Sequence, residues 1–378
     1  MSSITDILAH RRICICAGSG GVGKTTTSAA IAAGLAARGQ KVAVLTIDPA
    51  KRLADSLGLE ELGNEPRMVD PALFTEAGVE MKGELWAMML DAKATFDELV
   101  ERNAPDEASR DRILENRIYR QISSALAGSQ EYMAMAKLYE IHQSGEYDFL
   151  VLDTPPSRNA LDFLDAPKRL TQFIEGRSLQ IFMKPTGLAT SLIGRGSAVM
   201  FQVLKRILGF DLLSDIGEFL QAFSGMVDGF SERAKSVSAL LADPATSFIV
   251  VCGPQGEPIE EAIFFQRKLL EAEMPVGGII VNKVHYEIDG GEGVEKALTD
   301  QLGVDADLAA RVSANFDNYR ALASRDAENI SRLSRDLNAQ TIIRVPYFDE
   351  DVHDLGGLLK IDGYLFASGD ERERMAAS

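Results

Sequence analysis

One segment near the amino terminus limits the possible folds more than any other. The apolar run Arg12–Ala17 leads directly into Gly18-Ser19-Gly20-Gly21-Val22-Gly23-Lys24-Thr25-Thr26, and the alanine-rich helical segment Ser28–Arg38 follows. The order strand, glycine loop, helix directs backbone N–H groups and the positive end of a helix dipole at one anion. The sequence therefore predicts a phosphate-binding loop inside an α/β domain.

The loop residues have different expected roles. Lys24 is expected to reach the β- and γ-phosphates of a nucleotide, and the Thr25 hydroxyl is expected to ligate magnesium. A glycine-rich turn without a ligand is the alternative, and the Lys-Thr pair at the motif spacing argues against it. The predicted nucleotide contacts of the loop are Gly20, Gly21, Val22, Gly23, Lys24, Thr25 and Thr26.

Short β-branched runs alternate with helical patterns along the chain. The runs are apolar on both strand faces, which is typical of a mostly parallel sheet with helices on both sides. The predicted fold is therefore α/β, a P-loop NTPase. The predicted strands are Arg12–Ala17, Lys41–Ile47, Leu85–Leu90, Phe149–Asp153, Ser247–Cys252, Gly277–Asn282 and Thr341–Val345.

Two long helical stretches, 92–145 and 159–242, interrupt this alternation. They indicate one α-helical subdomain inserted between strands of the core. The ATPase core would then consist of 1–91, 146–158 and 243–367. The charged tail 368–378 is expected to be flexible and to fray.

Two carboxylates follow predicted strands. Asp48 comes after the run Lys41–Ile47, and Asp153 ends the run Phe149–Asp153. Ligands of an open parallel sheet bind at the carboxyl ends of the strands, so both side chains should lie beside the phosphate loop. We expect Asp153 to hold magnesium through a bound water and Asp48 to orient the attacking water, although either aspartate could instead cap a helix. With Lys24, they form the predicted catalytic set.

The end of the strand Gly277–Asn282 bears on the choice of base. A guanine-specific site would favour an aspartate where His285 stands, so the sequence favours adenine. Asn282 is predicted to contact the base, and a strand-end turn residue is an equally good interpretation.

Composition excludes several classes of protein. The formal net charge of −17 repels nucleic-acid phosphates, so no nucleic-acid partner is expected. No run approaches the roughly 20 apolar residues of a membrane helix, and the start of the chain has no apolar signal core. The three cysteines lie in predicted buried strands, which favours a reducing compartment. We therefore expect a cytoplasmic protein without stable membrane insertion.

These motifs together resemble the ArsA-type anion-transporting ATPases. That family includes the arsenite-efflux ATPase and the tail-anchored-protein targeting ATPase of the guided-entry pathway, and its phosphate loop is a deviant Walker A motif. The nearest likeness is to bacterial members. The resemblance covers nearly the whole chain and rests on the phosphate loop, Thr46–Ala50, Asp153–Pro156, Val281-Asn282 and Val345–Glu350.

The resemblance implies an ATPase that uses ATP and Mg²⁺ and acts as a homodimer or as a heterodimer with a related ATPase. The segments around Asp48 and Asp153 would be switches that move with nucleotide state. The segment Val345–Asp349 would lie against adenine, which makes Pro346 and Phe348 further expected nucleotide contacts.

The chain also departs from the family pattern. The family usually has a lysine where Ser19 stands, and that lysine reaches the phosphates of the partner subunit. A substitute charge would come from Lys51, Arg52, Arg158 or a different partner subunit, and each of these cations could equally be an ordinary surface group. The chain contains no Cys-x-x-Cys motif for zinc, and the helical stretches have no cysteine to bind arsenite.

The second helical stretch is rich in methionine and phenylalanine, which line adaptable surfaces for apolar helices. The sequence thus favours an ATPase that captures and releases a hydrophobic or membrane-protein client. The core of the subdomain itself is the alternative origin of these side chains. A partitioning-type assembly switch and an arsenite-pump subunit are the alternative functions. The residues concerned are Phe182, Met183, Met200, Phe201, Phe210, Phe219, Phe223, Met226 and Phe230.

Overall fold

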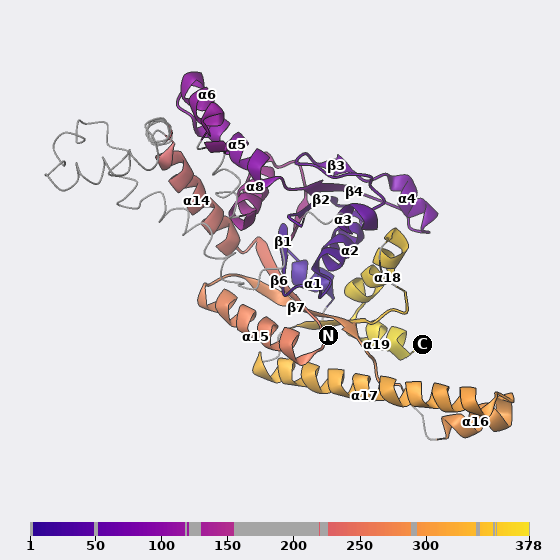
Figure 1. Cartoon of the computed structure of the whole chain (residues 1–378). Coiled ribbons are helices and arrows are strands. Elements are labelled where there is room, and N and C mark those ends of the chain that lie inside the picture. Colours follow the sequence, from indigo (N-terminus) through magenta and orange to yellow (C-terminus); the bar gives the residue numbers. More distant parts are fainter. Residues whose placement is uncertain are drawn as a thin grey trace, which may run out of the picture.

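The architecture was obtained from a computed structural model of the whole chain (Figure 1). The residues that the structure describes are 3–48, 52–117, 119–120, 130–154, 219, 226–288, 293–337, 341–350, 352 and 354–377.

An eight-stranded sheet forms the centre of the molecule, in the order β3-β4-β2-β5-β1-β6-β7-β8. Every neighbouring pair is parallel except β3 and β4. The sheet confirms the predicted fold class, and all seven predicted strands are present. The strands are β1 Ile13–Ala17, β2 Lys41–Thr46, β3 Arg67–Met68, β4 Glu84–Met89, β5 Phe149–Asp153, β6 Thr246–Cys252, β7 Val276–Val284 and β8 Ile342–Pro346.

Alternate residues of the central strands enter two separate hydrophobic cores, one on each face of the sheet. Cys14 and Cys16 of β1 enter the same core as α1, α2, α3, α4 and α18. Ile13 and Ile15 enter the other core, with α5, α6, α8, α14, α15 and α17. Burial on both faces explains why these strands were apolar at every position.

Helices of the first core and those that begin or end the chain are α1 Ile4–Leu8, α2 Lys24–Ala37, α3 Arg52–Ser56, α4 Pro71–Glu76, α18 Leu355–Phe366 and α19 Gly369–Ala377. Helices on the other side of the sheet are α5 Ala92–Asn103, α6 Glu107–Glu115, α8 Gln130–Ser144, α14 Val227–Ala242, α15 Gly256–Glu271, α16 Val294–Leu302 and α17 Ala306–Asp336.

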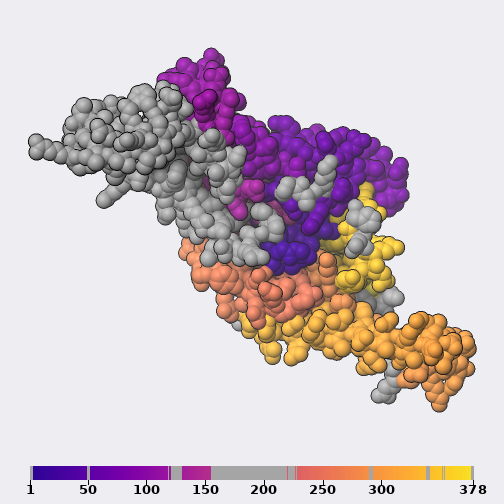
Figure 2. Space-filling view, viewed as in Figure 1, coloured from indigo at the N-terminus to yellow at the C-terminus, as the bar shows by residue number. Residues whose placement is uncertain are grey.

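The helix α17 is 31 residues long and was not anticipated within the predicted core segment 243–367. With α16 it forms a hairpin that projects beyond the sheet (Figure 1), and its orange tip stands out as an arm in Figure 2. The described parts of 92–145 are helical, whereas most of 159–242 lies outside the described residues. The boundaries of the inserted subdomain therefore stay a prediction.

The carboxyl-terminal tail differs from the sequence expectation. Residues Gly369–Ala377 form the helix α19 instead of fraying. The Ser368 N–H and hydroxyl donate to the Glu371 carboxylate at 2.9 Å each, and Ser368 Oγ accepts the Glu371 N–H at 3.3 Å, which is a capping box. The buried Arg372 guanidinium donates to the carbonyls of Tyr364 and Ala367 and holds α19 against α18.

Within the described part of the chain, no helix is both long enough and apolar enough to cross a membrane.

Candidate active site

The glycine loop joins the central strand β1 to α2 and cannot accept side chains at two of its positions. Gly23 has φ +92°, and a Cβ there would lie 2.2 Å from the Asn282 amide nitrogen. A Cβ on Gly18 would lie 2.0 Å from the carbonyl oxygen of Val251 in β6. No side chain caps the start of α2 at Gly23, so the first backbone N–H groups of the helix are available to an anion.

Lys24, the first residue of α2, is buried and points back along the loop. Its Nζ donates a hydrogen bond to the Ser19 carbonyl oxygen at 2.8 Å. Burial lowers the pKa of Lys24, the charges of Asp153 and Asp48 oppose that shift, and the Arg52 charge adds to it. The ammonium is thus held inside the loop, beside two carboxylates, where phosphate oxygens would offer it stronger partners.

Asp153 lies at the end of β5 with no exposed surface. Its Oδ2 accepts hydrogen bonds from the hydroxyls of Thr25, at 2.6 Å, and Thr46, at 2.9 Å. Its Oδ1 is buried and has no hydrogen-bond partner among the described residues. Burial raises the pKa of Asp153 to about 6, although the two hydroxyls and Lys24 pull in the opposite direction.

This arrangement fits a magnesium ion. Magnesium prefers oxygen ligands, keeps several waters, and is usually held by one or two protein groups plus substrate phosphates. Thr25 Oγ1 would offer such an ion a ligand oxygen, and the unpartnered Asp153 Oδ1 would offer an acceptor for water beside it. No cluster of three or more His, Cys, Asp or Glu side chains gathers for a metal among the described residues, so phosphate oxygens would complete the coordination.

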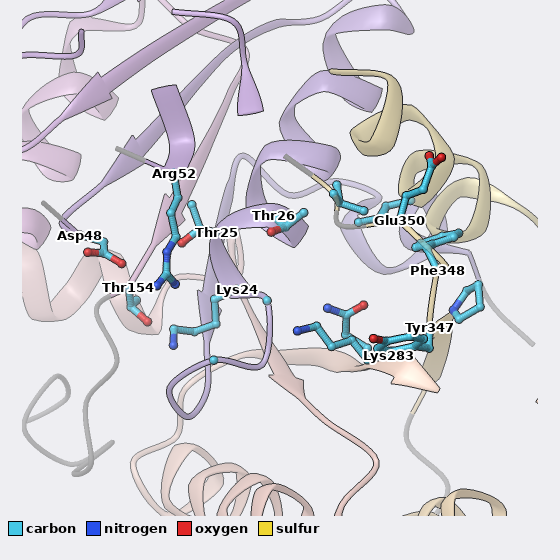
Figure 3. A pocket seen from close by; sticks show the side chains of 16 residues that line it. Lys24, Thr25, Thr26, Asp48, Arg52, Thr154, Lys283, Tyr347, Phe348 and Glu350 are labelled. Carbon is cyan, nitrogen blue, oxygen red and sulfur yellow. The ribbon is translucent and has the colours of Figure 1, made fainter. Parts of the chain in front are cut away.

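A pocket opens above this site, along the carboxyl ends of β1, β2, β5, β7 and β8 (Figure 3). Figure 3 shows Lys24, Thr25, Asp48 and Arg52 gathered at one end, and Lys283, Tyr347 and Phe348 at the other. The pocket is lined by Gly21, Gly23, Lys24, Thr25, Thr26, Asp48, Arg52, Thr154, Asn282, Lys283, Pro346, Tyr347, Phe348, Glu350, Val352 and Ile361.

Three predicted site residues do not line the pocket. Gly20 is exposed on the loop. Val22 is only 6% exposed and packs into the core. Asp153 lies beneath Thr25, where it can reach a metal only through another group. All other predicted contacts, Asp48 included, lie around the pocket.

Asn282 has a structural task besides any contact with a base. It lies inside β7, and its Nδ2 donates to the Val22 carbonyl oxygen at 2.9 Å. It therefore braces the phosphate loop against β7. The strand continues to Val284, so Asn282 is not the strand-end turn residue that the alternative interpretation required.

The pocket also contains residues that the sequence did not assign to it. Thr154 and Lys283 each follow a predicted site residue directly in the chain. Glu350 comes directly after the segment Val345–Asp349 that was predicted to lie against adenine, and Tyr347 lies within that segment although it was not singled out as a contact. These residues could have been predicted, because residues that directly follow parallel strands meet at one edge of the sheet.

The comparisons with known proteins agree with this geometry. The chain matches the family of anion-transporting ATPases over residues 11–329. Curated relatives include an ATPase ASNA1 homolog of Cryptosporidium parvum, 28% identical over 75% of this chain and 69% of the relative. The ATPase GET3A of Arabidopsis thaliana is 26% identical over 74% of this chain and 68% of the relative. The ATPase get3 of Aspergillus terreus is 27% identical over 89% of this chain and 84% of the relative.

The match covers most of the chain, including the phosphate loop and the strand ends that carry Asp48 and Asp153. This protein therefore belongs to the family of anion-transporting ATPases and is itself an ATPase.

Proposed function

We propose that the pocket above β1 hydrolyses ATP with magnesium, and that hydrolysis drives a conformational switch in a homodimer that captures and releases a hydrophobic protein segment. Lys24, Thr25 and Asp48 line one end of a single pocket and Asp153 lies beneath Thr25, and this convergence supports the chemistry. The family resemblance supports the dimer and the client.

Each of these residues has a task that its position allows. Lys24 exchanges the Ser19 carbonyl for oxygens of the β- and γ-phosphates. Thr25 Oγ1 would ligate magnesium while its hydroxyl keeps donating a hydrogen bond to Asp153, and Asp153 Oδ1 would accept a hydrogen bond from water at that site. The bound metal neutralises charge on the phosphates.

Asp48 orients the attacking water. It lines the pocket, and its backbone N–H is fixed by a hydrogen bond to Thr46 Oγ1 at 3.2 Å. The same Thr46 hydroxyl donates to Asp153, so one threonine connects both carboxylates. A carboxylate at this end can accept a water proton while the phosphoryl group leaves.

The order of elements along the chain supports a link between ATP hydrolysis in the pocket and movement of the helices. Thr154, which lines the pocket, directly follows β5, and in the sequence the predicted helical stretch 159–242 comes soon after it. After β4, which β2 separates from β5, the Asn64 side-chain oxygen accepts the Asp91 N–H at 3.1 Å, and Asn64 Nδ2 donates to Glu98 of α5 at 2.8 Å. Buried Lys137 of α8 donates to the same Glu98 at 2.8 Å. Movement at the strand ends would thus be transmitted to α5 and α8.

Only part of the proposed client surface can be placed. Phe219, Met226 and Phe230 are at most 5% exposed and belong to the hydrophobic core. Phe230 stacks on Phe96 with 5.8 Å between ring centroids, so these side chains stabilise the subdomain and do not face a client. The other phenylalanines and methionines of the predicted groove lie outside the described residues. The client surface must be sought among them.

The client can be tested with a defined segment. We expect the protein, held with a nonhydrolysable ATP analogue and magnesium, to crosslink to a soluble fusion that carries a helix of about 20 apolar residues. A matched fusion with four lysines in that helix is the control for hydrophobicity. The same mixture on a column with light-scattering detection should show a dimer.

Lys24→Ala supplies the control for nucleotide dependence. It should lose both the crosslink and the ATP-dependent dimer, because it loses the phosphate contacts. Equal crosslinking with and without nucleotide, or with the lysine-bearing fusion, would contradict client capture. A strictly monomeric ATP-bound protein would contradict the dimeric switch.

A further inference from the structure

At the phosphate end of the pocket, the buried cation Lys24 is accompanied by two carboxylates, Asp48 in the lining and Asp153 beneath Thr25. Negative charge on the phosphoryl oxygens must be stabilised during transfer, and fixed cations at those oxygens contribute most to the rate. A second cation at this end would therefore have a large effect on catalysis.

The described lining of the pocket offers three cations, Lys24, Arg52 and Lys283. Lys283 follows Asn282 in β7 and lies beside Tyr347, at the opposite end from Asp48 (Figure 3). Arg52 is the cation that shares the phosphate end with Lys24. The alternatives Lys51 and Arg158 lie outside the described residues.

Arg52 is held in place by its own helix. It is the first residue of α3, and the next two residues, Leu53 and Ala54, are only 1% and 3% exposed. They anchor the helix in the core while Arg52 stays at the surface of the pocket. Figure 3 shows its side chain descending from α3 into the space between Asp48 and Thr25, toward Lys24.

The electrostatics agree with this position. Burial is the main cause that lowers the pKa of Lys24, and the Arg52 charge is the one cation that lowers it further. The two positive groups thus lie close enough to repel each other. The charges of Asp153 and Asp48 each act on Lys24 more strongly than that of Arg52, and the triphosphate of ATP would add further negative charge at this end.

We propose that Arg52 is a catalytic residue whose guanidinium contacts the γ-phosphoryl oxygens of bound ATP and stabilises the charge that develops there. The chain then supplies this cation from its own segment after β2, so the partner subunit is not required to supply it. The planar guanidinium suits two phosphoryl oxygens at once, which an ammonium at the same place does not. This inference rests on the proposed ATP site.

The test compares Arg52→Ala, Arg52→Lys and the control Arg67→Ala, in which an exposed arginine of β3 outside the pocket is removed. We expect Arg52→Ala to lower kcat by about 10- to 100-fold and to change the Kd of magnesium-ADP by less than about twofold. Arg52→Lys should recover part of the loss, and Arg67→Ala should hydrolyse ATP normally. Melting curves verify that the variants fold.

Binding of magnesium-ADP with aluminium fluoride, which mimics the phosphoryl group in transfer, gives the decisive measurement. Its affinity should fall in Arg52→Ala by about the same factor as kcat. An Arg52→Ala enzyme with normal kcat would overturn the inference. So would an equal loss of ADP affinity, which would place Arg52 on the other phosphates, or a lower kcat with unchanged affinity for the fluoride complex.

Lys24→Ala separates this inference from the site assignment. If Lys24→Ala hydrolyses ATP normally, the pocket itself is wrongly assigned and the Arg52 proposal falls with it. If Lys24→Ala is inactive and Arg52→Ala is normal, the site stands and only the role of Arg52 is refuted.

Discussion

Thr25 and Asp153 meet where α2 begins and β5 ends, with 2.6 Å between Thr25 Oγ1 and Asp153 Oδ2. The hydroxyl therefore uses its only hydrogen on the carboxylate, and its lone pairs remain available to a metal. A buried carboxylate with an unused oxygen destabilises the protein unless a cation is near. The same geometry that prepares a magnesium site therefore lowers the stability of the metal-free protein.

That relationship predicts how Asp153→Asn changes stability with pH. Burial raises the pKa of Asp153 from 3.8 in a model peptide to about 6 in the folded protein, which corresponds to about 3 kcal/mol. Because the folded pKa is the higher one, this cost is absent below about pH 4 and complete above about pH 6. In metal-free, nucleotide-free protein, Asp153→Asn should raise the free energy of unfolding by about 1 to 3 kcal/mol at pH 8.

Urea unfolding in EDTA at pH 4 and pH 8 measures this difference. The stabilisation at pH 8 should disappear near pH 4, and magnesium-ATP should protect the variant far less than the natural protein. If Asp153→Asn changed the free energy of unfolding equally at pH 4 and pH 8, ionisation of the buried Asp153 would not be the cause of the change.

Lys24→Ala should abolish magnesium-dependent ATP hydrolysis. The ammonium contacts the Ser19 carbonyl within the loop and no other part of the protein through a hydrogen bond in the described residues. The fold should consequently survive, with a circular dichroism spectrum like that of the natural protein. An active Lys24→Ala enzyme would refute the assignment of this pocket.

Asp48→Asn should separate binding from turnover. The loop and Lys24 provide most contacts to ground-state ATP, whereas Asp48 lines the pocket where water would attack. We expect a near-normal Kd for ATP and a kcat reduced by about 100-fold. If affinity and turnover fell by the same factor, Asp48 would be a binding residue and the water would need another base.

The sheet was predictable because its physics is local. Strands such as Val42–Leu45 are buried on both faces, so an unbroken apolar run marks each of them. The two-residue strand β3 was not predicted because both of its residues are exposed at the edge of the sheet. No apolar pattern distinguishes such a strand from a loop.

Two helices show where sequence patterns lose their signal. In α17 only Ala309, Ala323, Asp326, Ile330 and Leu333 are buried, so most of the helix faces solvent and its apolar stripe is thin. The tail that forms α19 was expected to be flexible because it is highly charged. The spacing Ser368-x-x-Glu371, however, is a recognisable signal for the start of a helix. Where the apolar periodicity of a segment is weak, capping residues therefore help to predict a helix.

The positions of the two proposed catalytic carboxylates, Asp48 and Asp153, could be predicted from sequence since a parallel sheet brings its strand ends together. The direction of Arg52 could not, because it depends on how α3 packs after the strand. Contacts between distant segments were equally hidden. The partner of His285 lies 41 residues away in α17, and no spacing rule joins them.

That partner gives the last prediction. Asp326 has no exposed surface, and its Oδ2 lies 2.7 Å from His285 Nδ1 and accepts the His285 backbone N–H at 3.1 Å. The imidazole stacks on Tyr347 of the pocket, with 5.3 Å between ring centroids. The pair therefore fastens the long helix α17 to the end of the pocket that carries Tyr347.

A double-mutant cycle measures this fastening. Asp326→Ala and His285→Ala should each lower the free energy of unfolding by about 1 to 3 kcal/mol, since the first removes the acceptor of both His285 hydrogen bonds and the second leaves the buried Asp326 carboxylate with the backbone N–H alone. The loss in the double variant should be smaller than the sum of the two single losses by at least about 0.5 kcal/mol. The reason is that the first substitution has already broken the interaction between the two side chains, so the second cannot break it again. Glu328→Ala, on the exposed side of α17, should change stability by less than about 0.5 kcal/mol. Strictly additive losses would mean that the two residues stabilise the protein independently and that α17 is held to the pocket by other contacts.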